Sequence, residues 1–437
     1  MKRFVKSRSI FILMVFLCTL LTFSATWVVE LIGFPMSISR LLAILVYLPF
    51  ACLVLTKVCL DIRHWRSALT VSNGFFYAFA VYYAALFGYR FLRGMEIKEH
   101  LYYSIVFFGA ISLYMLLRDR FTDLKDRDMA INLIWIALFF VVYRLIYCAV
   151  GARFLEFSPI NVNLTSGAVA LLMPLLSYWL TSDTLSRKQR ILCWITLAGG
   201  VVVIATTGAR ALFWLSVITV GVILLSSIFT KSDWIRLTTA VVAGCLIVVG
   251  LCLGNVGRTR YAVYRETGLT ISLSSPSNPS DPDNPDEEEP DEDQLAAQEQ
   301  VGASNQMRSE LVAMGVEQMQ LNPWFGTGDV LYVTYPRPDF KAVQSSHNFL
   351  IEAIICYGVF GLIMIAGLFI SLIGETGLFV KMGKEQRRTK IVLLLTLFFY
   401  FAFGFVQPTV FNPIICLLFV MAVAAVRGLL QQPEVQE

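Results

Sequence analysis

The sequence predicts an all-α membrane protein, a bundle of about twelve transmembrane helices with one long extracytoplasmic loop. Hydrophobic residues make up 57% of the 437 residues and charged residues only 15%, whereas a soluble domain of this size carries roughly a quarter charged residues. The apolar residues gather in runs of about 17–25 residues, the length that crosses a bilayer as a helix. One segment, about 255–345, is polar instead. It separates nine predicted helices in 1–254 from three in 346–437.

The apolar runs place the predicted helices in order along the chain. The first run follows a basic start, Met1-Lys2-Arg3, which is typical of a signal peptide. The run is long enough to span a bilayer and has no convincing small-residue cleavage site, so we interpret it as a retained helix. The predicted helices occupy residues 10–32, 39–58, 70–90, 101–117, 129–150, 159–181, 190–207, 210–230, 235–254, 347–373, 389–407 and 410–429.

Positive charge sets the predicted orientation. Basic residues gather at the N-terminus and in connections that fall on one side of a twelve-helix arrangement, and the positive-inside rule assigns that side to the cytoplasm. Both termini are then cytoplasmic, and the long polar loop lies outside. The basic connections are Asp61–Arg66, Arg118–Arg127, Ser186–Arg190, Lys231–Arg236 and Lys381–Lys390.

The polar loop has two predicted parts. Residues 272–300 begin with a run rich in proline, aspartate and glutamate that cannot bury enough apolar surface to fold, so they form a disordered acidic spacer. A calcium or cationic-partner site is the alternative, and the prolines argue against a fixed ligand cage. Residues 305–321 have apolar residues at helical spacing and predict an amphipathic helix. The helix ends at Asn322-Pro323, and residues 324–328 follow as a glycine-dependent turn.

Several arginines lie on the predicted outer side, where the positive-inside rule makes them scarce. Arg210 occupies a very short junction between two helices, so its guanidinium is held in a defined place, and Arg308 begins the loop helix. Arg144 lies about two turns below the outer face, where a charge is costly unless it faces a wet or paired interior. Arg90, Arg93 and Arg258 are interpreted as reaching lipid headgroups. The other outward arginines considered are Arg40, Arg153, Arg260 and Arg265. Such a cluster suits a ligand with several phosphate oxygens, which the planar guanidinium binds in pairs.

His347 is one of three histidines in the chain and lies where the polar loop meets an apolar run. Cations nearby would disfavour the charged imidazolium, and a neutral imidazole can accept a proton from a hydroxyl. The alternative is a capping or interfacial histidine at a helix start. His64 and His100 offer no zinc-binding spacing, so no metal site is predicted. No nucleotide-binding fingerprint occurs, so no cofactor is predicted, and a net charge of +4 is too small to imply nucleic acid.

Two segments after the acidic spacer resemble motifs of the O-antigen ligase and polysaccharide polymerase superfamily. Residues 308–328, read as R-x-E-L-x-x-x-G-x-E-Q-x-x-x-N-P-W-F-G-T-G, resemble its R…P-x-x-G-x-G stretch. Residues 347–362 are similar to its H-N-x-x-L…G-x-x-G-L segment. The positions that match the turn of the first motif are Pro323, Gly326 and Gly328.

A third segment and one departure complete the resemblance. Thr207-Gly208-Ala209-Arg210 looks like the T-x-S-R hairpin of the superfamily, with Ala209 in place of the usual serine. The superfamily also tends to carry an acidic residue before the first glycine of the histidine segment. Here Cys356 and Tyr357 occupy that place, so no role is assigned to a carboxylate there.

The resemblance implies a metal-independent membrane glycosyltransferase of the GT-C type, which uses undecaprenyl diphosphate-linked glycans at the outer face of the bacterial cytoplasmic membrane. Arg210 and Arg308 would hold the diphosphate and stabilise the charge on the departing lipid. His347 would take the proton of the acceptor hydroxyl as it attacks the anomeric carbon, and one displacement would invert that carbon. The further candidates for diphosphate binding are Arg144, Arg153, Arg258, Arg260 and Arg265.

Other functions stay open at this point. A polymerase joins one repeat unit to another, and a ligase moves a finished glycan to lipid A core or another acceptor. Polymerase is slightly favoured because nothing in the sequence points to a lipid A core partner. A transporter or flippase is the main alternative outside enzymes, followed by a non-catalytic membrane component. Many transporters have two similar halves joined by a central cytoplasmic loop, whereas here the long loop follows the ninth helix and no repeat is visible.

Overall fold

The computed structural model contains helices and no strands in the part of the chain that it describes, which confirms the all-α class. The described residues are 36–66, 68–94, 98–120, 126–150, 162–207, 209–230, 232–254, 256, 259–267, 292–327, 348–376, 378–379, 384–406 and 413–430. The chain divides into two compact units, one of residues 1–136 with 308–437 and one of residues 137–307.

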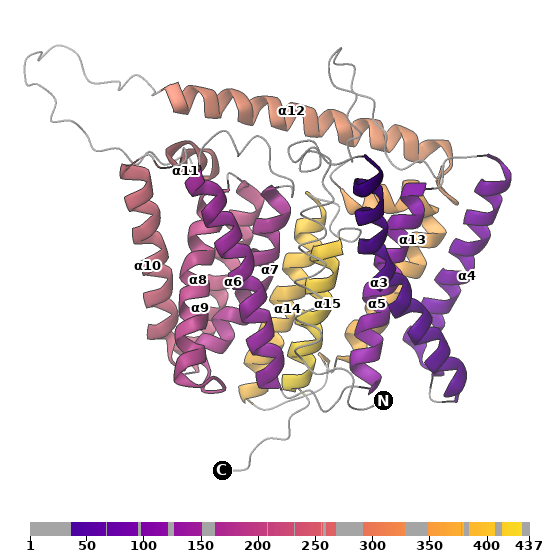
Figure 1. The fold of residues 1–437 in the computed structure, drawn as a ribbon, viewed down its shortest axis with the longest axis horizontal. Coiled ribbons are helices and arrows are strands. Elements are labelled where there is room, and N and C mark those ends of the chain that lie inside the picture. Colours follow the sequence, from indigo (N-terminus) through magenta and orange to yellow (C-terminus); the bar gives the residue numbers. More distant parts are fainter. Residues whose placement is uncertain are drawn as a thin grey trace, which may run out of the picture. The chain divides into compact units, whose positions relative to one another are not determined.

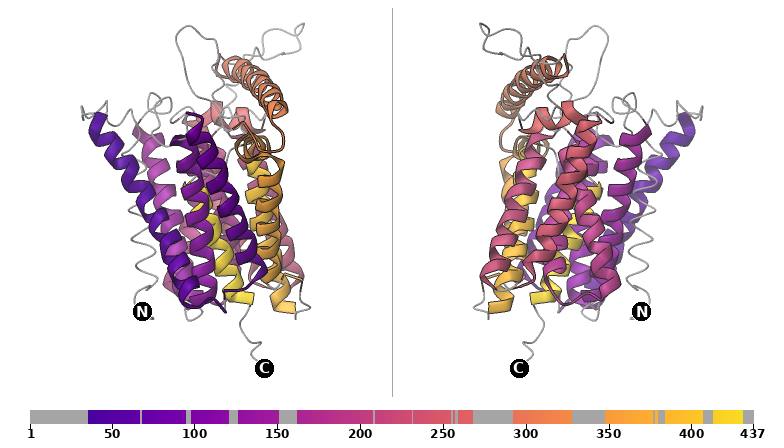
Figure 2. Two further views of the ribbon diagram at one scale, coloured as in Figure 1. Left: turned by 90° about the vertical axis from the view of Figure 1, so that its right-hand side faces the viewer. Right: turned by 90° about the vertical axis from the view of Figure 1, so that its left-hand side faces the viewer.

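The first unit gathers helices from both ends of the chain. α4 packs against α13 and α3 packs against α5 (Figures 1 and 2). α15 packs against α5 and α14, and it is buried from Ile414 to Val423, as expected for a helix that is apolar on all sides. The helices of this unit are α3 (Met36–Arg63), α4 (Val71–Leu92), α5 (Lys98–Arg120), α13 (Phe349–Glu375), α14 (Lys384–Gly404) and α15 (Pro413–Leu430).

The second unit is built around α7. This helix packs against α8 and α9 and is buried from Ser166 to Thr181, and α8 also packs against α10. The short α11 contributes Val263 to a buried cluster with Val202 of α8 and Val248 of α10. The helices of this unit are α7 (Val162–Thr181), α8 (Arg187–Ala205), α9 (Arg210–Phe229), α10 (Trp234–Leu253) and α11 (Thr259–Thr267). Two further helices, α6 (Asp126–Val150) and α12 (Glu292–Leu321), have residues in both units.

Helices lie at every predicted membrane range from 39–58 onward, and the first range, 10–32, falls outside the described residues. Within the described residues, five helices are long and apolar enough to cross a membrane: α4, α8, α9, α10 and α13. Shorter apolar stretches lie in α5, α6, α7 and α15. The chain is therefore a membrane protein. The count of twelve spans, their orientation and the three-part division based on it stay predictions.

α12 differs from the predicted loop helix in where it begins. It starts at Glu292 rather than near residue 305, so residues 292–300, which we assigned to the disordered spacer, are helical. Its end at Leu321 agrees with the prediction. The physical reason is composition, because the prolines stop at Pro290 and the residues after it are mainly glutamine, alanine, leucine and glutamate, which favour helix.

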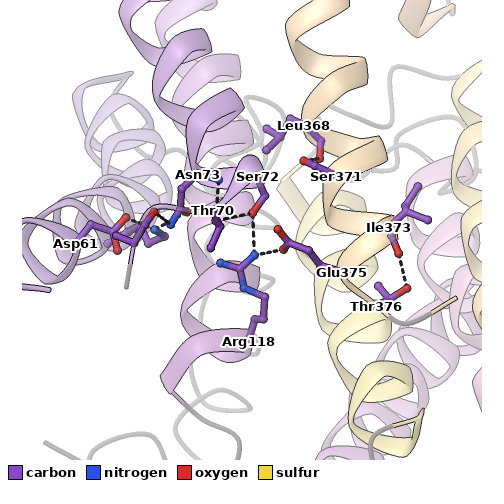
Figure 3. Close-up of polar contacts among 12 residues, drawn as sticks. Asp61, Thr70, Ser72, Asn73, Arg118, Leu368, Ser371, Ile373, Glu375 and Thr376 are labelled. Atoms are coloured by element: carbon purple, nitrogen blue, oxygen red, sulfur yellow. Dashed lines mark hydrogen bonds and ion pairs between the residues drawn. The ribbon is translucent and has the colours of Figure 1, made fainter. Parts of the chain in front are cut away.

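Charged side chains in the first unit are paired at one end of the bundle. Figure 3 shows Arg118 of α5 between Ser72 of α4 and Glu375 of α13; it donates to the Ser72 hydroxyl at 2.8 Å and forms an ion pair with Glu375. Lys57 of α3 is ion-paired with Asp61 and donates to Asn73 of α4 at 2.9 Å. A buried charge is tolerated when it is paired in this way. These contacts join α3, α4, α5 and α13 where α4 begins.

Candidate functional site

The turn after α12 is built by one glycine and one asparagine. Gly326 has a φ of 76°, a left-handed conformation that favours glycine. Its N–H donates to the Asn322 carbonyl at 2.8 Å, and the Asn322 side-chain amide donates to the Gly326 carbonyl at 3.1 Å. The glycine-dependent turn predicted over 324–328 is confirmed for residues 324–327. We call residues 322–327 the docking turn.

α13 is a broken helix. The sequence predicted one continuous helix over 347–373, but Gly358 has a φ of 68° and a ψ of 179° inside α13. Only glycine commonly adopts this conformation, because a Cβ atom would clash with the backbone. The break ends one helical segment at Tyr357 and starts a second at Val359.

The docking turn closes the break by taking over its hydrogen bonds. The N–H of Val359 donates to the Pro323 carbonyl at 2.8 Å, and that of Phe360 donates to the Trp324 carbonyl at 3.4 Å. The backbones meet without intervening side chains. A methyl group on Gly326 would lie 2.9 Å from the Gly358 nitrogen, and one on Gly358 would overlap the Trp324 carbonyl. The two motif segments of the resemblance thus form one structure, and each contributes a glycine to the contact.

Two side chains of α4 bind backbone carbonyls at the break and in the docking turn. Arg90 donates through Nη2 to the Cys356 carbonyl at 2.8 Å and to the Phe325 carbonyl at 3.2 Å. The Tyr82 hydroxyl donates to the Tyr357 carbonyl at 2.6 Å. The interpretation of Arg90 as a headgroup contact is therefore wrong, since the residue is only 3% exposed and binds protein carbonyls. The local sequence around a charge near a helix end does not show whether that charge faces lipid or protein.

Tyr357 fills the place where the superfamily tends to carry an acidic residue. Its side chain is buried, and its hydroxyl shares a 2.9 Å hydrogen bond with the Ser104 hydroxyl of α5. Its ring meets Phe79 edge-on, with 5.3 Å between centroids. In this chain the position supports packing between α13, α4 and α5.

Arg308 lies on the packed face of α12. Leu311 and Gly315, three and seven residues further on, are buried, and Arg308 itself is half-buried. Residues at these spacings share one side of a helix. Val312, between them, is exposed. The side of α12 that packs against the protein thus presents an arginine, whereas the adjacent side faces outward.

Exposed aromatic rings surround the docking turn. Trp324 is 57% exposed, and its ring lies 5.6 Å from that of Phe360, measured between centroids; Phe325 lies 5.5 Å from Phe360. Clusters of tryptophan and other aromatic rings are typical of the surface of a bilayer. The rings therefore suit a turn that lies at a membrane surface.

Arg210 is in the second unit and is the first residue of α9. It is exposed, and the junction before it is fixed by a 2.6 Å hydrogen bond between the Thr207 and Ser166 hydroxyls. A positive side chain in the first turn of a helix opposes the helix dipole. Helix stability therefore does not explain this arginine, whereas an anionic ligand at this end of α9 would be favoured by both the dipole and the guanidinium.

The other arginine candidates of the second unit lie in different surroundings. Arg144 of α6 is 1% exposed, as expected for a charge that faces an interior. Arg260 of α11 donates to the Cys252 carbonyl at 2.7 Å and the Leu253 carbonyl at 3.1 Å, which caps the end of α10. Arg265 lies half-buried in the last turn of α11.

The remaining candidates fall outside the described residues: His347, Arg153, Arg258 and Gly328. The residue after His347 is described. Asn348 caps α13, and its side-chain oxygen accepts from the N–H groups of Leu350 at 3.0 Å and Ile351 at 3.4 Å. A fixed helix start therefore follows directly after the histidine in the sequence.

Comparison with known proteins identifies one family. Residues 191–366 match the family described as O-antigen ligase, which confirms the resemblance to that superfamily. No curated protein matches the chain. The matched range contains Arg210, Arg308, the docking turn and the break at Gly358, whereas Arg90 lies outside it.

Proposed function

We propose that this membrane protein, whose residues 191–366 form an O-antigen ligase domain, transfers a glycan from undecaprenyl diphosphate to an acceptor hydroxyl. The reaction takes place at the outer face of the bacterial cytoplasmic membrane. The family match carries the proposal, because members of this family are glycosyltransferase-like enzymes that act on lipid-linked polysaccharide. The joining of the docking turn to the break in α13 supports it, since both motif segments take part in one structure.

The diphosphate is bound by Arg210 and Arg308. Each guanidinium can place two N–H donors on phosphate oxygens. As the bond between the sugar and the diphosphate breaks, negative charge grows on the leaving oxygen, and fixed cations stabilise that charge. The position of Arg308 on the packed face of α12 and that of Arg210 at the positive end of α9 both suit this role.

His347 acts as the general base. The acceptor oxygen attacks the anomeric carbon and forms the new glycosidic bond, while the carbon–oxygen bond to the diphosphate breaks. The proton of the hydroxyl moves to the imidazole, and the electron pair leaves with the undecaprenyl diphosphate. One displacement of this kind inverts the anomeric carbon. Only neutral imidazole can accept the proton.

The acceptor is assigned as a second repeat unit, which makes the protein a polymerase. The reason is that nothing in the sequence points to a lipid A core partner. A ligase that moves finished glycan is the second candidate. A transporter or flippase is the candidate outside enzymes. The products separate all three, because only a polymerase makes a ladder and only a transporter moves its substrate without forming a bond.

Replacing Arg210 or Arg308 by alanine should lower transfer by about 100-fold or more, the effect of removing one donor that stabilises transition-state charge. Lysine should not restore full activity, because its point charge cannot reproduce the paired donors. Transfer is measured with lipid-linked donor and purified variants. Arg187→Ala is the matched control, since Arg187 is likewise an exposed first residue of a helix in the same unit. If Arg210→Ala transfers glycan at the wild-type rate, Arg210 does not bind the diphosphate.

Transfer should continue at an undiminished rate in EDTA. In this proposal guanidinium groups balance the diphosphate charge, a task that divalent cations perform in many phosphoryl enzymes. The measurement is the initial rate with and without chelator in metal-free buffer. Loss of transfer in EDTA that added Mg²⁺ restores would contradict the metal-independent mechanism.

A further inference from the structure

Arg90 joins two segments that are far apart in the sequence. It lies in the last turn of α4 and is almost wholly buried. One of its nitrogens, Nη2, reaches the Cys356 carbonyl of α13 and the Phe325 carbonyl of the docking turn, with the Gly326 carbonyl at 3.5 Å. Removing this side chain would therefore loosen the docking turn and α13 at the same point.

The break in α13 removes the usual helical partner of one carbonyl that Arg90 binds, that of Cys356. In an unbroken helix the Cys356 carbonyl would accept from the N–H of Phe360, four residues on. That N–H donates instead to the Trp324 carbonyl. An open backbone carbonyl inside a membrane protein is costly unless another group satisfies it. Arg90 donates to this carbonyl and to that of Phe325, so it ties the broken helix to the docking turn.

α4 is shaped to hold the break. Tyr82 and Arg90 are eight residues apart, which places them on one side of the helix. Tyr82 binds the Tyr357 carbonyl while Arg90 binds the preceding one, so two consecutive carbonyls take their donors from one face of α4. A methyl group on Gly361 would lie 3.3 Å from the Tyr82 ring, so the second segment of α13 also rests against this face.

We propose that Arg90 is a positioning residue for the transfer reaction, and that it acts by locking the docking turn onto the broken helix α13. This inference rests on the proposed function. α12 leads without a proline from Arg308 to the docking turn. Fourteen residues separate Arg308 from Asn322, about 20 Å of helix, so a tilt of roughly 10° at the turn moves Arg308 by about 3.5 Å. Displacements of about 1 Å can cost an enzyme roughly 100-fold in rate.

The activity experiment uses the full-length protein with lipid-linked glycan donor. Arg90→Ala should lower kcat by about 100-fold, while the KM for the donor should change by no more than about threefold, because a misplaced Arg308 mainly loses its interaction with the charge that grows in the transition state. Arg90→Lys retains the charge and one donor and should recover part of kcat. Arg93→Ala is the matched control. Arg93 lies three residues further along the chain, is exposed and stacks on Tyr89 at 5.4 Å, and its loss should change kcat by less than about twofold.

A double-mutant cycle tests whether Arg90 acts through Arg308. If Arg90 positions Arg308, adding Arg308→Ala to Arg90→Ala should cause little further loss, because both changes remove one interaction with the donor. If the rate losses of the two single variants multiply in the double variant, the proposal is contradicted. A rise in the KM for the donor with kcat retained would also overturn it, since Arg90 would then bind the donor directly.

Hydrogen exchange tests whether Arg90 holds the docking turn on α13, and this measurement does not depend on glycan transfer. The N–H groups of Val359 and Phe360 should be protected in the wild-type protein and exchange faster in both Arg90 variants, while exchange in α8 and α10 should stay unchanged. Unchanged exchange over 322–327 and 358–361 in both variants would overturn the proposal. If the wild-type protein transfers no glycan, the proposed function fails, and the exchange result still decides whether Arg90 locks the turn.

Discussion

Replacing His347 by alanine should abolish glycan transfer while the protein still inserts in the membrane in normal amounts. A general base contributes about 10²–10⁴-fold to the rate, and here it removes the only proton that the acceptor must lose. The residue directly precedes Asn348, which caps α13, so substitution leaves the described start of that helix intact. The measurement is product formation from lipid-linked donor, with membrane abundance determined in parallel.

His64→Ala is the control for this variant. His64 is exposed and lies in the turn after α3, on the side predicted to be cytoplasmic, and its loss should leave transfer unchanged. His347→Gln retains a polar side chain but cannot act as a base near neutral pH, so it should be as inactive as the alanine variant. Normal transfer by either His347 variant would show that another group accepts the proton.

Placing a methyl group on Gly358 should expel the docking turn and lower transfer by about 100-fold or more, the cost of misplacing a catalytic segment. Two effects add in Gly358→Ala. The methyl group would overlap the backbone of Trp324, and alanine in this backbone conformation costs on the order of 1–3 kcal/mol. The break would then straighten or the turn would move away. Transfer and hydrogen exchange over 322–327 both report the change.

Gly374→Ala is the matched control, because Gly374 lies in the same helix and a methyl group there meets no atom within 4 Å. It should leave transfer and exchange unchanged. If Gly358→Ala transfers glycan at the wild-type rate, the contact between the docking turn and α13 has no part in the reaction. Faster exchange at the turn with full activity would lead to the same conclusion.

The sequence predicts the helices well because their signal is local. A run of apolar residues long enough to cross a bilayer forms a helix whatever surrounds it, and α4, α9 and α10 lie within a few residues of their predicted ranges. The end of α12 at Leu321 was also predictable, since Pro323 has no backbone N–H to donate and disfavours a helical conformation in the residue before it. The left-handed Gly326 follows from its place in a tight turn.

The contacts between segments were not predictable in the same way. Gly358 lies in an apolar run whose composition does not change at the break, and a glycine within a membrane helix is common. What breaks the helix is the close approach of Trp324, which is 34 positions away in the sequence. Arg90 shows the same limit. Its burial depends on carbonyls of the docking turn and α13, so its own neighbours in sequence predict only a charge near a helix end.

The most direct test of the account is reconstitution of the purified protein in vesicles with a lipid-linked repeat unit. The account predicts new glycosidic bonds: a ladder of lipid-linked products with the wild-type protein, insensitive to EDTA, and none with His347→Ala. A single product on an added acceptor would show that the protein is a glycosyltransferase of the ligase kind. Movement of the donor across the vesicle membrane with no new bond would contradict the central claim that this protein is a glycosyltransferase.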